Sequence, residues 1–514
     1  MSWIPVVDAA QAAAWDERAR TAGKIPSRVL MEAAGRGVAH VVAREFGDQL
    51  AAGAILLAGR GNNGGDGWVA ARALKAVGIN VWALEASGHG ELSDDCAANR
   101  ALALASGVEL LDPDDPWPDA AVLIDALLGT GASGSPRGVI GQLLERARHS
   151  SIPAVAVDGP TGLDLSTGQA YDPLPALLTV TFGGLRRGHL LGRRYCGKIV
   201  VLDIGFPPPD PAWPEFVDDR WASARLPGFE PEMHKGERGR VLVIGGSAGM
   251  AGAALHAASA ALEAGSGLVK IAASEPSVAA AQAALPDALT VVSALGPGIE
   301  PALGEAIRWA DAIVLGPGLG RSKDRGEFVK AVLEEATVPV VVDADALQVG
   351  ERMLRAGNAP RVLTPHMGEF RACFPELAEI AGEDRFGGAQ RAAELMGQNA
   401  AVLLKGVPTV VARSGVRTLV VGSGNPALAT GGSGDLLAGF IASFLARGLT
   451  PEVAAALGAQ VLGRAAEVAA ARLTVRATRP ADVLAALAEL WRRWADLPPA
   501  RPPILLELDP PQVL

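Results

Sequence analysis

Short apolar runs alternate with amphipathic stretches through the first part of the chain. The runs are AILLA at 54–58, NVWAL at 80–84, AVLIDALLG at 121–129, AVAVDGPTG at 154–162, LTVTFGG at 178–184 and KIVVLDIG at 198–205. Helical patterns follow the earlier runs, starting from about Trp68, about Asp94 and Gly138. Strands that alternate with helices predict a mostly parallel sheet covered on both faces, a Rossmann-like three-layer α/β/α domain.

The same alternation resumes further along the chain. Its runs are RVLVIGG at 240–246, GLVKIAA at 267–273, AIVLGPGLG at 312–320, PVVVDADAL at 339–347, RVLTPHMGEF at 361–370, AVLLKG at 401–406, TVVARS at 409–414 and RTLVV at 417–421. Prolines crowd residues 206–239, where neither a helical nor a strand period survives. We therefore predict two α/β domains, at 1–224 and 225–495, followed by an extended proline-rich tail at 496–514.

Composition narrows the classes of function. The chain has 514 residues, 49% hydrophobic and 20% charged, which is typical of globular domains. A net charge of −10 and 4% aromatic residues argue against a nucleic-acid partner. Three cysteines without C-x-x-C spacing argue against disulfides or zinc, and we find no signal peptide or apolar stretch long enough to span a bilayer. We expect a cytoplasmic homo-oligomer that acts on small molecules, with no membrane partner.

Three polar or glycine-rich loops of the first domain follow apolar strands. They are GRGNNGGDG from Gly59, DALLGTGASGSPRG from Asp125 and VDGPTGLD from Val157. Loops at the carboxyl ends of parallel strands meet at one edge, so we expect them to form one pocket. The first contains G-x-G-x-x-G, and Glu85 follows at the distance of a ribose-binding carboxylate, which leaves a dinucleotide-binding dehydrogenase open. The carboxylates Asp125 and Asp158 instead indicate acid/base chemistry or a cation.

These motifs, together with TVTFGGLRRGHL at 179–190, resemble those of the NAD(P)H-hydrate epimerase family, and RVLMEAAGRGVA at 28–39 resembles its opening helix. The resemblance implies that Asp158 is the acid/base residue and that Asn63, Asp125 and Thr161 help bind potassium. It also implies that the hydrated nicotinamide nucleotide is held by Asn62, Asn63, Gly64, Gly65, Asp66, Gly129, Thr130, Gly131, Ala132, Ser133, Gly134, Ser135 and Asp158. Ala33 stands where the family usually has asparagine, and DGPTG replaces DIPSG.

In the second half, the segment ATGGSGDLLAGFIASFLARGL at 429–449 joins a glycine-rich turn to an apolar helix. Free N–H groups and the positive end of a helix dipole together predict a phosphate site. Asp435 lies in this turn, where a carboxylate would repel phosphate unless it faces a hydroxyl that must lose its proton. Lys405, at the end of an apolar strand, would neutralise transferred charge.

The surrounding motifs GGSAGMAGA, GPGLG, DADAL, TPHMGE and LKGVPTV resemble those of the ADP-dependent NAD(P)H-hydrate dehydratases, members of the ribokinase-like superfamily. Met367 replaces the usual proline of TPHPGE. The resemblance implies that Asp435 is the base and that magnesium and ADP take part. It implies nicotinamide contacts at Ala253, Gly318, His366 and Asp435, and adenine-nucleotide contacts at Lys405, Gly406, Val407, Pro408, Thr409 and Gly434.

We therefore predict a bifunctional repair enzyme for NADH or NADPH that has gained water at C6 of the nicotinamide ring. The first domain would interconvert the R and S epimers, and the second would dehydrate the S form at the expense of ADP, giving AMP and phosphate. Two alternatives stay open at this point. One is a ribokinase-superfamily small-molecule kinase with a non-catalytic nucleotide-binding front domain, and the other is an interaction scaffold.

Overall fold

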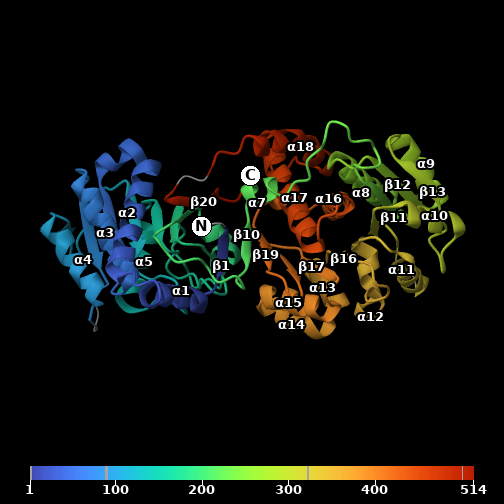
Figure 1. Ribbon diagram of the computed structural model, residues 1–514. Helices are drawn as coiled ribbons and strands as arrows, with labels where there is room; N and C mark the ends of the chain where they lie inside the picture. Colours follow the sequence, from blue (N-terminus) through green and yellow to red (C-terminus); the bar gives the residue numbers. More distant parts are fainter. Residues whose placement is uncertain (1–2, 87–90, 321–322, 500–501, 514) are drawn as a thin grey trace. The chain divides into compact units, whose positions relative to one another are not determined.

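The computed structural model describes residues 3–86, 91–320, 323–499 and 502–513 (Figure 1). The chain forms two compact units. Unit 1 comprises Met1–Pro214 and Pro498–Pro511, and unit 2 comprises Glu215–Leu497 and Gln512–Leu514. Both are α/β, as the alternating pattern predicts.

Unit 1 is built on a sheet with the strand order β20-β9-β7-β6-β5-β2-β3-β4. The strands are β2 (Ala54–Ala58), β3 (Val81–Glu85), β4 (Glu109–Leu110), β5 (Val122–Ala126), β6 (Ala154–Val157), β7 (Leu178–Phe182), β9 (Lys198–Leu202) and β20 (Ile504–Leu508). All neighbours pair in parallel except β20, which runs antiparallel to β9. A separate parallel pair joins β1 (Ile4–Val7) to β8 (Leu185–Arg186). The chain reverses its direction of travel through the sheet between β2 and β5, which is where open parallel sheets bind ligands.

Helices cover both faces of this sheet. On one face α2 (Ser27–Phe46), α3 (Asn62–Ala76) and α4 (Asp94–Ala105) share one apolar core with the strands, which includes Val38, Trp68, Ala103, Leu56 and Ile124. On the other face α5 (Gly138–His149) packs onto Ile55 and Leu123. The remaining helices are α1 (Ala9–Thr21), α6 (Arg187–Leu191) and the 3-10 turns Gly47–Ala52 and Arg193–Tyr195. The unit is thus a three-layer α/β/α domain.

Helix α3 begins at Asn62, six residues before the predicted start at Trp68, so residues 62–66 form its first turns rather than a loop. Small residues make this possible. A Cβ on Gly65 would lie 2.5 Å from the Met31 side chain, and one on Gly67 would lie 2.6 Å from Ala126. The glycines therefore let α3 pack closely against α2 and the sheet, a role that the pattern of polar residues concealed.

Unit 2 contains a sheet with the strand order β13-β12-β11-β14-β15-β16-β17-β18-β19-β10. The strands are β10 (Glu215–Val217), β11 (Arg240–Ile244), β12 (Leu268–Ala273), β13 (Leu289–Val292), β14 (Ala312–Leu315), β15 (Val340–Val342), β16 (Arg361–Leu363), β17 (Ala400–Leu404), β18 (Thr409–Arg413) and β19 (Leu419–Val421). Pairing is parallel from β13 through to β17, antiparallel for β17–β18 and β18–β19, and parallel for β19–β10.

One face of this sheet packs on a large apolar core supplied by α8 (Ala251–Glu263), α16 (Ser433–Ala446), α17 (Pro451–Leu473) and α18 (Pro480–Ala495). The other helices are α7 (Asp219–Ser223), α9 (Glu275–Ala284), α10 (Pro301–Trp309), α11 (Lys323–Glu335), α12 (Glu351–Leu354), α13 (Met367–Cys373), α14 (Ala378–Glu383) and α15 (Arg385–Met396), with 3-10 turns at Ala344–Val349, Pro375–Leu377 and Pro426–Leu428. By length and composition alone α17 could cross a membrane, contrary to our expectation from the sequence, but 83% of its most apolar window is buried inside the unit. It is a core helix.

The two units part at Pro214 and Glu215, ten residues before the predicted boundary at 224 and 225. Residues 215–217 form β10, which pairs with β19, so this short strand belongs to unit 2 although prolines surround it. The tail, which the sequence predicts to be extended, contains a strand. Its strand β20 returns to unit 1 and pairs with β9 along the edge of that sheet.

Candidate active sites

In unit 1, three side chains singled out by the sequence lie at the carboxyl ends of neighbouring strands. Asn63 is in the first turn of α3, which follows β2, while Asp125 lies near the end of β5 and Asp158 directly follows β6. Since β2, β5 and β6 are adjacent, these residues share one edge of the sheet. The predicted convergence of the three loops is confirmed at this level.

Asp158 is buried and held by several donors. Its Oδ2 atom accepts hydrogen bonds from the Thr130 backbone N–H at 3.0 Å and from the Thr130 hydroxyl, and its Oδ1 atom accepts one from Thr181 Oγ1 at 3.0 Å. The backbone of Asp158 has a φ of 64°, in the left-handed region that non-glycine residues seldom adopt. Such strain is typical of functional positions and persists only where the surroundings enforce it.

The charge of Asp158 is balanced by Arg186, whose Nη2 atom lies 3.1 Å from Oδ1. Burial opposes ionisation of Asp158, but Arg186 and the Thr130 hydrogen bonds outweigh it and lower the pKa of the carboxyl. His189 lies beneath, with Nε2 2.7 Å from the Asp158 carbonyl oxygen and Nδ1 accepting the Arg186 N–H at 3.0 Å. Burial lowers the pKa of His189 to about 4, so this imidazole is neutral at pH 7.

Asp125 and Thr161 form a second buried pair at the same edge. Thr161 donates to Asp125 through its N–H, at 2.8 Å from Oδ2, and through its hydroxyl, at 2.7 Å from Oδ1. Burial raises the pKa of Asp125, although these hydrogen bonds work in the opposite direction. The structure thus brings two of the three predicted potassium ligands into direct contact.

Asn63, the third predicted ligand, has buried Oδ1 and Nδ2 atoms without a hydrogen-bond partner among the described residues. A Cβ on Gly129 would lie 3.2 Å from the Asn63 Cγ atom, so the carboxamide lies against the 129–135 segment. Unpaired polar atoms in a buried site need an explanation. An amide oxygen that is free to coordinate a hard cation supplies one.

The other residues predicted to hold the nicotinamide nucleotide surround this edge. Asp66 lies half-buried in α3, and burial, together with the charges of Asp158 and Asp16, raises its pKa well above the ordinary value. Gly64 and Gly65 are buried inside packing contacts, whereas Asn62 is exposed and accepts a 3.3 Å hydrogen bond from Ser93. In the 129–135 segment, Gly131, Ser133, Gly134 and Ser135 are exposed and Gly129, Thr130 and Ala132 are half-buried. Their contacts with substrate stay predictions.

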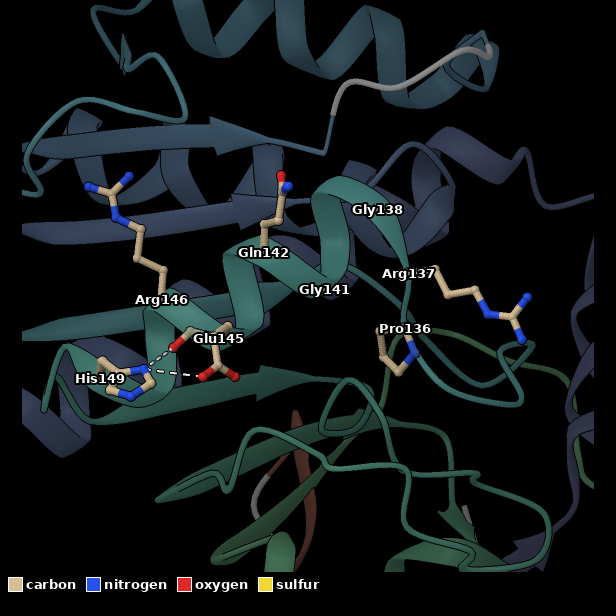
Figure 2. A pocket seen from close by; sticks show the side chains of 8 residues that line it. All are labelled: Pro136, Arg137, Gly138, Gly141, Gln142, Glu145, Arg146 and His149. Carbon is tan, nitrogen blue, oxygen red and sulfur yellow. Dashed lines mark hydrogen bonds and ion pairs between the residues drawn. The ribbon is translucent and has the colours of Figure 1, made fainter.

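A surface hollow of about 670 Å³ begins where the 129–135 segment ends. Figure 2 shows it along α5, with Arg137 at one end and the interacting pair Glu145 and His149 at the other. Its lining among the described residues is Pro136, Arg137, Gly138, Gly141, Gln142, Glu145, Arg146 and His149. Asp125 and Asp158 do not line it, so the hollow is separate from the cluster of buried carboxylates.

In unit 2, Lys405 joins the ends of several strands. It follows β17, and its Nζ atom lies 3.1 Å from Asp343 Oδ1 and 3.4 Å from Glu369 Oε2. Asp343 follows β15 and accepts a 2.7 Å hydrogen bond from Thr364, which follows β16. Burial opposes the charged form of Lys405, but the two carboxylates outweigh it and raise the pKa of the ammonium group. Lys405 is therefore a fixed, charged group rather than a mobile surface lysine.

Helix α16 brings Gly434 and Asp435 to this cluster. Its N-cap, Gly432, has a φ of 99°, which favours glycine, and the helix starts at Ser433. A Cβ on Gly434 would lie 3.5 Å from Lys405 Nζ and 3.7 Å from Asp343 Oδ2. Burial, followed by the charge of Asp343, raises the pKa of Asp435 to about 7. A general base is most effective when its pKa lies near the working pH, so a value of about 7 would suit the role that the sequence predicts for Asp435.

The predicted nicotinamide contacts fall in two places. A Cβ on Gly318 would lie 3.2 Å from the Ala253 Cβ atom, so these two residues are neighbours. His366 is exposed and caps α13, with Nδ1 accepting the Gly368 N–H at 2.9 Å while its own backbone N–H donates to Glu369 at 2.9 Å. A β-bridge joins His366 to Lys405. The replacement of proline by Met367 leaves this capping arrangement intact.

The nucleotide segment predicted at 405–409 forms the turn between β17 and β18. The Thr409 hydroxyl donates a 3.1 Å hydrogen bond to the Gly406 carbonyl oxygen, which closes the turn. Gly406 and Val407 are exposed, whereas Pro408 is buried. Through Lys405, whose Nζ atom would lie 3.5 Å from a Cβ on Gly434, the structure brings this turn close to the start of α16.

Comparison with known proteins identifies the two halves. Residues 27–188 match the family model described as YjeF-related protein N-terminus, and residues 241–489 match the model described as NAD(P)H-hydrate dehydratase. The bifunctional NAD(P)H-hydrate repair enzyme Nnr of Moorella thermoacetica is 36% identical over 507 residues, which cover 93% of this chain and 95% of that protein. The chain belongs to this family. The Escherichia coli enzyme of the same name is 35% identical over 84% of each chain.

Among solved structures, an ADP/ATP-dependent NAD(P)H-hydrate dehydratase from Bacillus subtilis, co-crystallised with ATP and Mg²⁺, is 30% identical. It has a TM-score of 0.49, covering 54% of this chain and 98% of that one. Membership of the bifunctional NAD(P)H-hydrate repair family accounts for both domains as enzymes. It therefore sets aside the dehydrogenase, the kinase with a non-catalytic front domain and the scaffold.

Several residues of these repair-enzyme sites were missed by sequence reasoning. They are Thr181 and Arg186 beside Asp158, His189 beneath it, and Asp343, Thr364 and Glu369 beside Lys405. All six lie inside motifs that carry the resemblance, but only contact in three dimensions shows their partners. Glu85, the candidate ribose ligand, pairs with Arg100, whose Nη2 atom is 2.9 Å from Oε2.

Proposed function

We propose that the strand-end site of unit 1 epimerises hydrated NADH and NADPH, and that the strand-end site of unit 2 dehydrates the S epimer with ADP, giving AMP and phosphate. The epimerase and dehydratase activities are supported by the family to which the chain belongs, because its two family models match one unit each. The observation that supports the assignment of residues is the contrast between two aspartates. Asp158 has a lowered pKa and Asp435 a pKa of about 7.

In unit 1, Asp158 is the residue that exchanges a proton with the substrate. Its lowered pKa keeps it ionised at pH 7, ready to accept a proton. Thr130 and Thr181 fix the direction of its oxygens, and Arg186 stabilises its charge while no substrate is bound. The 129–135 segment, which contains Thr130, would hold the hydrated nicotinamide nucleotide close to this carboxylate.

We also propose potassium as the cofactor of unit 1. The unpaired Asn63 Oδ1 atom and the oxygens of Asp125 and Thr161 fit a hard cation. When bound, the ion would supply positive charge close to the anionic nucleotide. Asn63, Asp125 and Thr161 would hold it, and they would also fix the relative positions of the loops after β2, β5 and β6.

In unit 2, Asp435 takes the proton of the C6 hydroxyl as that oxygen attacks the terminal phosphorus of ADP. The bond between this phosphorus and the bridging oxygen breaks and releases AMP. Phosphate then leaves C6 and a proton leaves C5, which restores the dihydropyridine. Lys405, fixed by Asp343 and Glu369, places positive charge next to Gly434 at the start of α16, where backbone N–H groups can bind an anion.

Magnesium fits the chemistry of this second site. Asp343 and Glu369 supply carboxylate oxygens, and Mg²⁺ in such sites is commonly held by one or two carboxylates together with substrate phosphates. When bound, it would neutralise phosphate charge during transfer. We further propose a homo-oligomer in the cytoplasm, a compartment that suits the three free, buried cysteines.

One experiment tests the proposed function as a whole. The protein is incubated with mixed epimers of hydrated NADH together with ADP, magnesium and potassium, and the absorbance of the dihydropyridine is followed. We expect full recovery, because epimerisation feeds the S form to the dehydratase. Recovery of only the S fraction would contradict the role given to unit 1, and no recovery with either ADP or ATP would contradict that given to unit 2.

A further inference from the structure

Arg385, the first residue of α15, contacts the 405–409 turn from outside the nucleotide motif. Its Nη1 and Nη2 atoms donate hydrogen bonds of 3.3 and 3.2 Å to the Lys405 carbonyl oxygen. A Cβ on Gly406 would clash with the Nη2 atom, so the guanidinium packs directly against the glycine backbone. The side chain is thus held at the turn that we assign to the adenine nucleotide.

The hydrogen bonds of Arg385 differ from those of Arg361, another arginine of this unit whose guanidinium is held by backbone. Arg361 donates to four backbone carbonyls, those of Leu354, Ala356, Gly357 and Ala359, as expected of a purely structural guanidinium. Arg385 donates to a single carbonyl, and no carboxylate pairs with it among the residues that the structure describes. Since a guanidinium has five N–H donors, Arg385 keeps donors for another acceptor.

The charges around the turn favour an anion as that acceptor. Lys405 is already paired with Asp343 and Glu369, so its positive charge is offset inside the protein. Asp435 adds a further carboxyl group to the same cluster. Before Mg²⁺ is bound, a nucleoside diphosphate that approaches this edge would meet an excess of negative charge, and a guanidinium at the turn would offset part of it. Arg385 can be that cation, because it touches the turn and no described carboxylate offsets its charge.

We propose that Arg385 binds the phosphates of the adenine nucleotide, held in place for that task by the Lys405 carbonyl. The inference rests on the proposed function of unit 2 and adds to it a residue that lies outside the 405–409 and 434 positions. Guanidinium groups suit this role, because they bind phosphate oxygens in bidentate geometry and remain charged when half-buried.

The test compares a ligand with phosphates and one without. Dissociation constants for ADP and for adenosine are measured by titration calorimetry with the full chain, in the wild type and in Arg385→Met, Arg385→Lys and Arg391→Met. Arg391 is an exposed arginine on the same helix and serves as the matched control. We expect Arg385→Met to weaken ADP binding roughly ten- to a hundredfold, the range of a hydrogen bond to a charged group, with adenosine binding unchanged. The ADP dissociation constant of Arg385→Lys should lie between those of the wild type and Arg385→Met. That of Arg391→Met should equal the wild-type value.

Two outcomes would overturn the inference. Unchanged ADP binding in Arg385→Met would show that the guanidinium does not meet the phosphates, and an equal loss of ADP and adenosine binding would show a merely structural role in the turn. Thermal unfolding of the same variants checks that unit 2 has folded, and Arg385→Lys provides a milder change. A wild-type chain that shows no ADP-dependent dehydration would instead refute the proposed function itself.

Discussion

Arg186 joins Asp158 to the segment that we expect to hold its substrate. Its Nη2 atom lies 3.1 Å from Asp158 Oδ1, and its Nε atom donates a 2.9 Å hydrogen bond to Thr130 Oγ1. Thr130 itself donates its N–H and its hydroxyl to the other carboxylate oxygen of Asp158. One buried guanidinium therefore contributes both to the ionisation of the proposed catalytic residue and to the position of the 129–135 segment.

Replacing Arg186 by methionine should affect both stability and catalysis in unit 1. Removing one partner of a buried ion pair costs about 3–5 kcal/mol, because the remaining charge is left uncompensated. The pKa of Asp158 should rise in consequence. As the pH is lowered, the variant should therefore lose epimerase activity at a higher pH than the wild type does. Thermal unfolding and the pH profile of epimerisation measure the two effects. Arg36→Met, which breaks an exposed i,i+4 pair, is the control and should change neither.

The pH dependence of the two activities should differ because the two aspartates titrate differently. Dehydration should rise with pH and reach half its maximum near pH 7, where Asp435 loses its proton. Epimerisation should already be independent of pH there, because the pKa of Asp158 is lowered. Initial rates of each reaction from about pH 5 to about pH 9 bracket the general-base titration. Superimposable profiles would contradict the separate assignments.

The raised pKa of Asp435 also makes the free energy of unfolding of unit 2 depend on pH. The folded state binds this proton more tightly than the unfolded state, so its contribution falls as pH rises from the unfolded pKa towards about 7. Above that, the folded chain carries an unfavourable charge. Asp435→Asn should accordingly stabilise unit 2 at about pH 8, on the order of 1 kcal/mol after allowance for solvent screening, and much less at about pH 5. Chemical unfolding at the two pH values measures the difference.

Much of the fold could be predicted because parallel strands buried on both faces appear as continuous apolar runs. AILLA and AVAV are two such runs, and they form β2 and β6. The short strands β10 and β20 were not predicted from the sequence. Prolines flank both of them, and each is stabilised by a partner strand that is far away in the sequence. The glycines at 64, 65 and 67 were interpreted as a loop, although they serve helix packing.

In the two candidate sites, too, some residues could be predicted from the sequence and others could not. Asp158 and Asp435 could be singled out, since each ends or begins an element inside a conspicuous motif. Arg186 and Arg385 could not, because nothing in the local sequence shows that their side chains return to Asp158 and to Lys405. Their importance depends on pairing across elements, which periodicity does not encode.

Strand β20 allows a test of how far the stability of unit 1 depends on the C-terminal segment Pro498–Pro511, which follows unit 2 in the sequence. Leu506 of β20 is buried, and neighbouring Glu507 pairs with Arg44 at 2.6 Å and Lys198 at 3.2 Å. Leu506→Asp would place a charge in this apolar contact and should destabilise unit 1 by roughly 2–4 kcal/mol. Epimerase activity should become heat-sensitive while dehydratase activity keeps its wild-type melting behaviour. The exposed Val513→Asp serves as a control, and equal loss of both activities would contradict the division into units.

Gly434 tests the access of phosphate to α16. A single Cβ here would make only ordinary contacts, at 3.5 Å from Lys405 Nζ, so Gly434→Ala should fold normally. The additional methyl groups of Gly434→Val would occupy the space through which an anion approaches the backbone. We expect Gly434→Val to abolish dehydration and ADP binding, with Gly434→Ala affected less. ADP affinity that is unchanged in the valine variant would place the phosphates elsewhere.

The two aspartates allow the reactions to be separated within one chain. Asp158→Asn preserves the shape of the side chain and the hydrogen bonds of one of its two oxygens but cannot accept a proton. Epimerisation should therefore fall about 10²- to 10⁴-fold while dehydration of pure S substrate continues. Asp435→Asn should stop ADP-dependent dehydration while the R and S forms still equilibrate. Each reaction is measured alone, with the other variant as its matched control.

Mixing the two variants then tests whether the units work independently. Each unit has its own sheet and its own strand-end site, so the S epimer made by Asp435→Asn can diffuse to the intact dehydratase of Asp158→Asn. The mixture should therefore repair R and S substrate completely, although neither variant does so alone. Loss of both activities in either single variant, or failure of the mixture to recover complete repair, would show that the reactions are not confined to separate units.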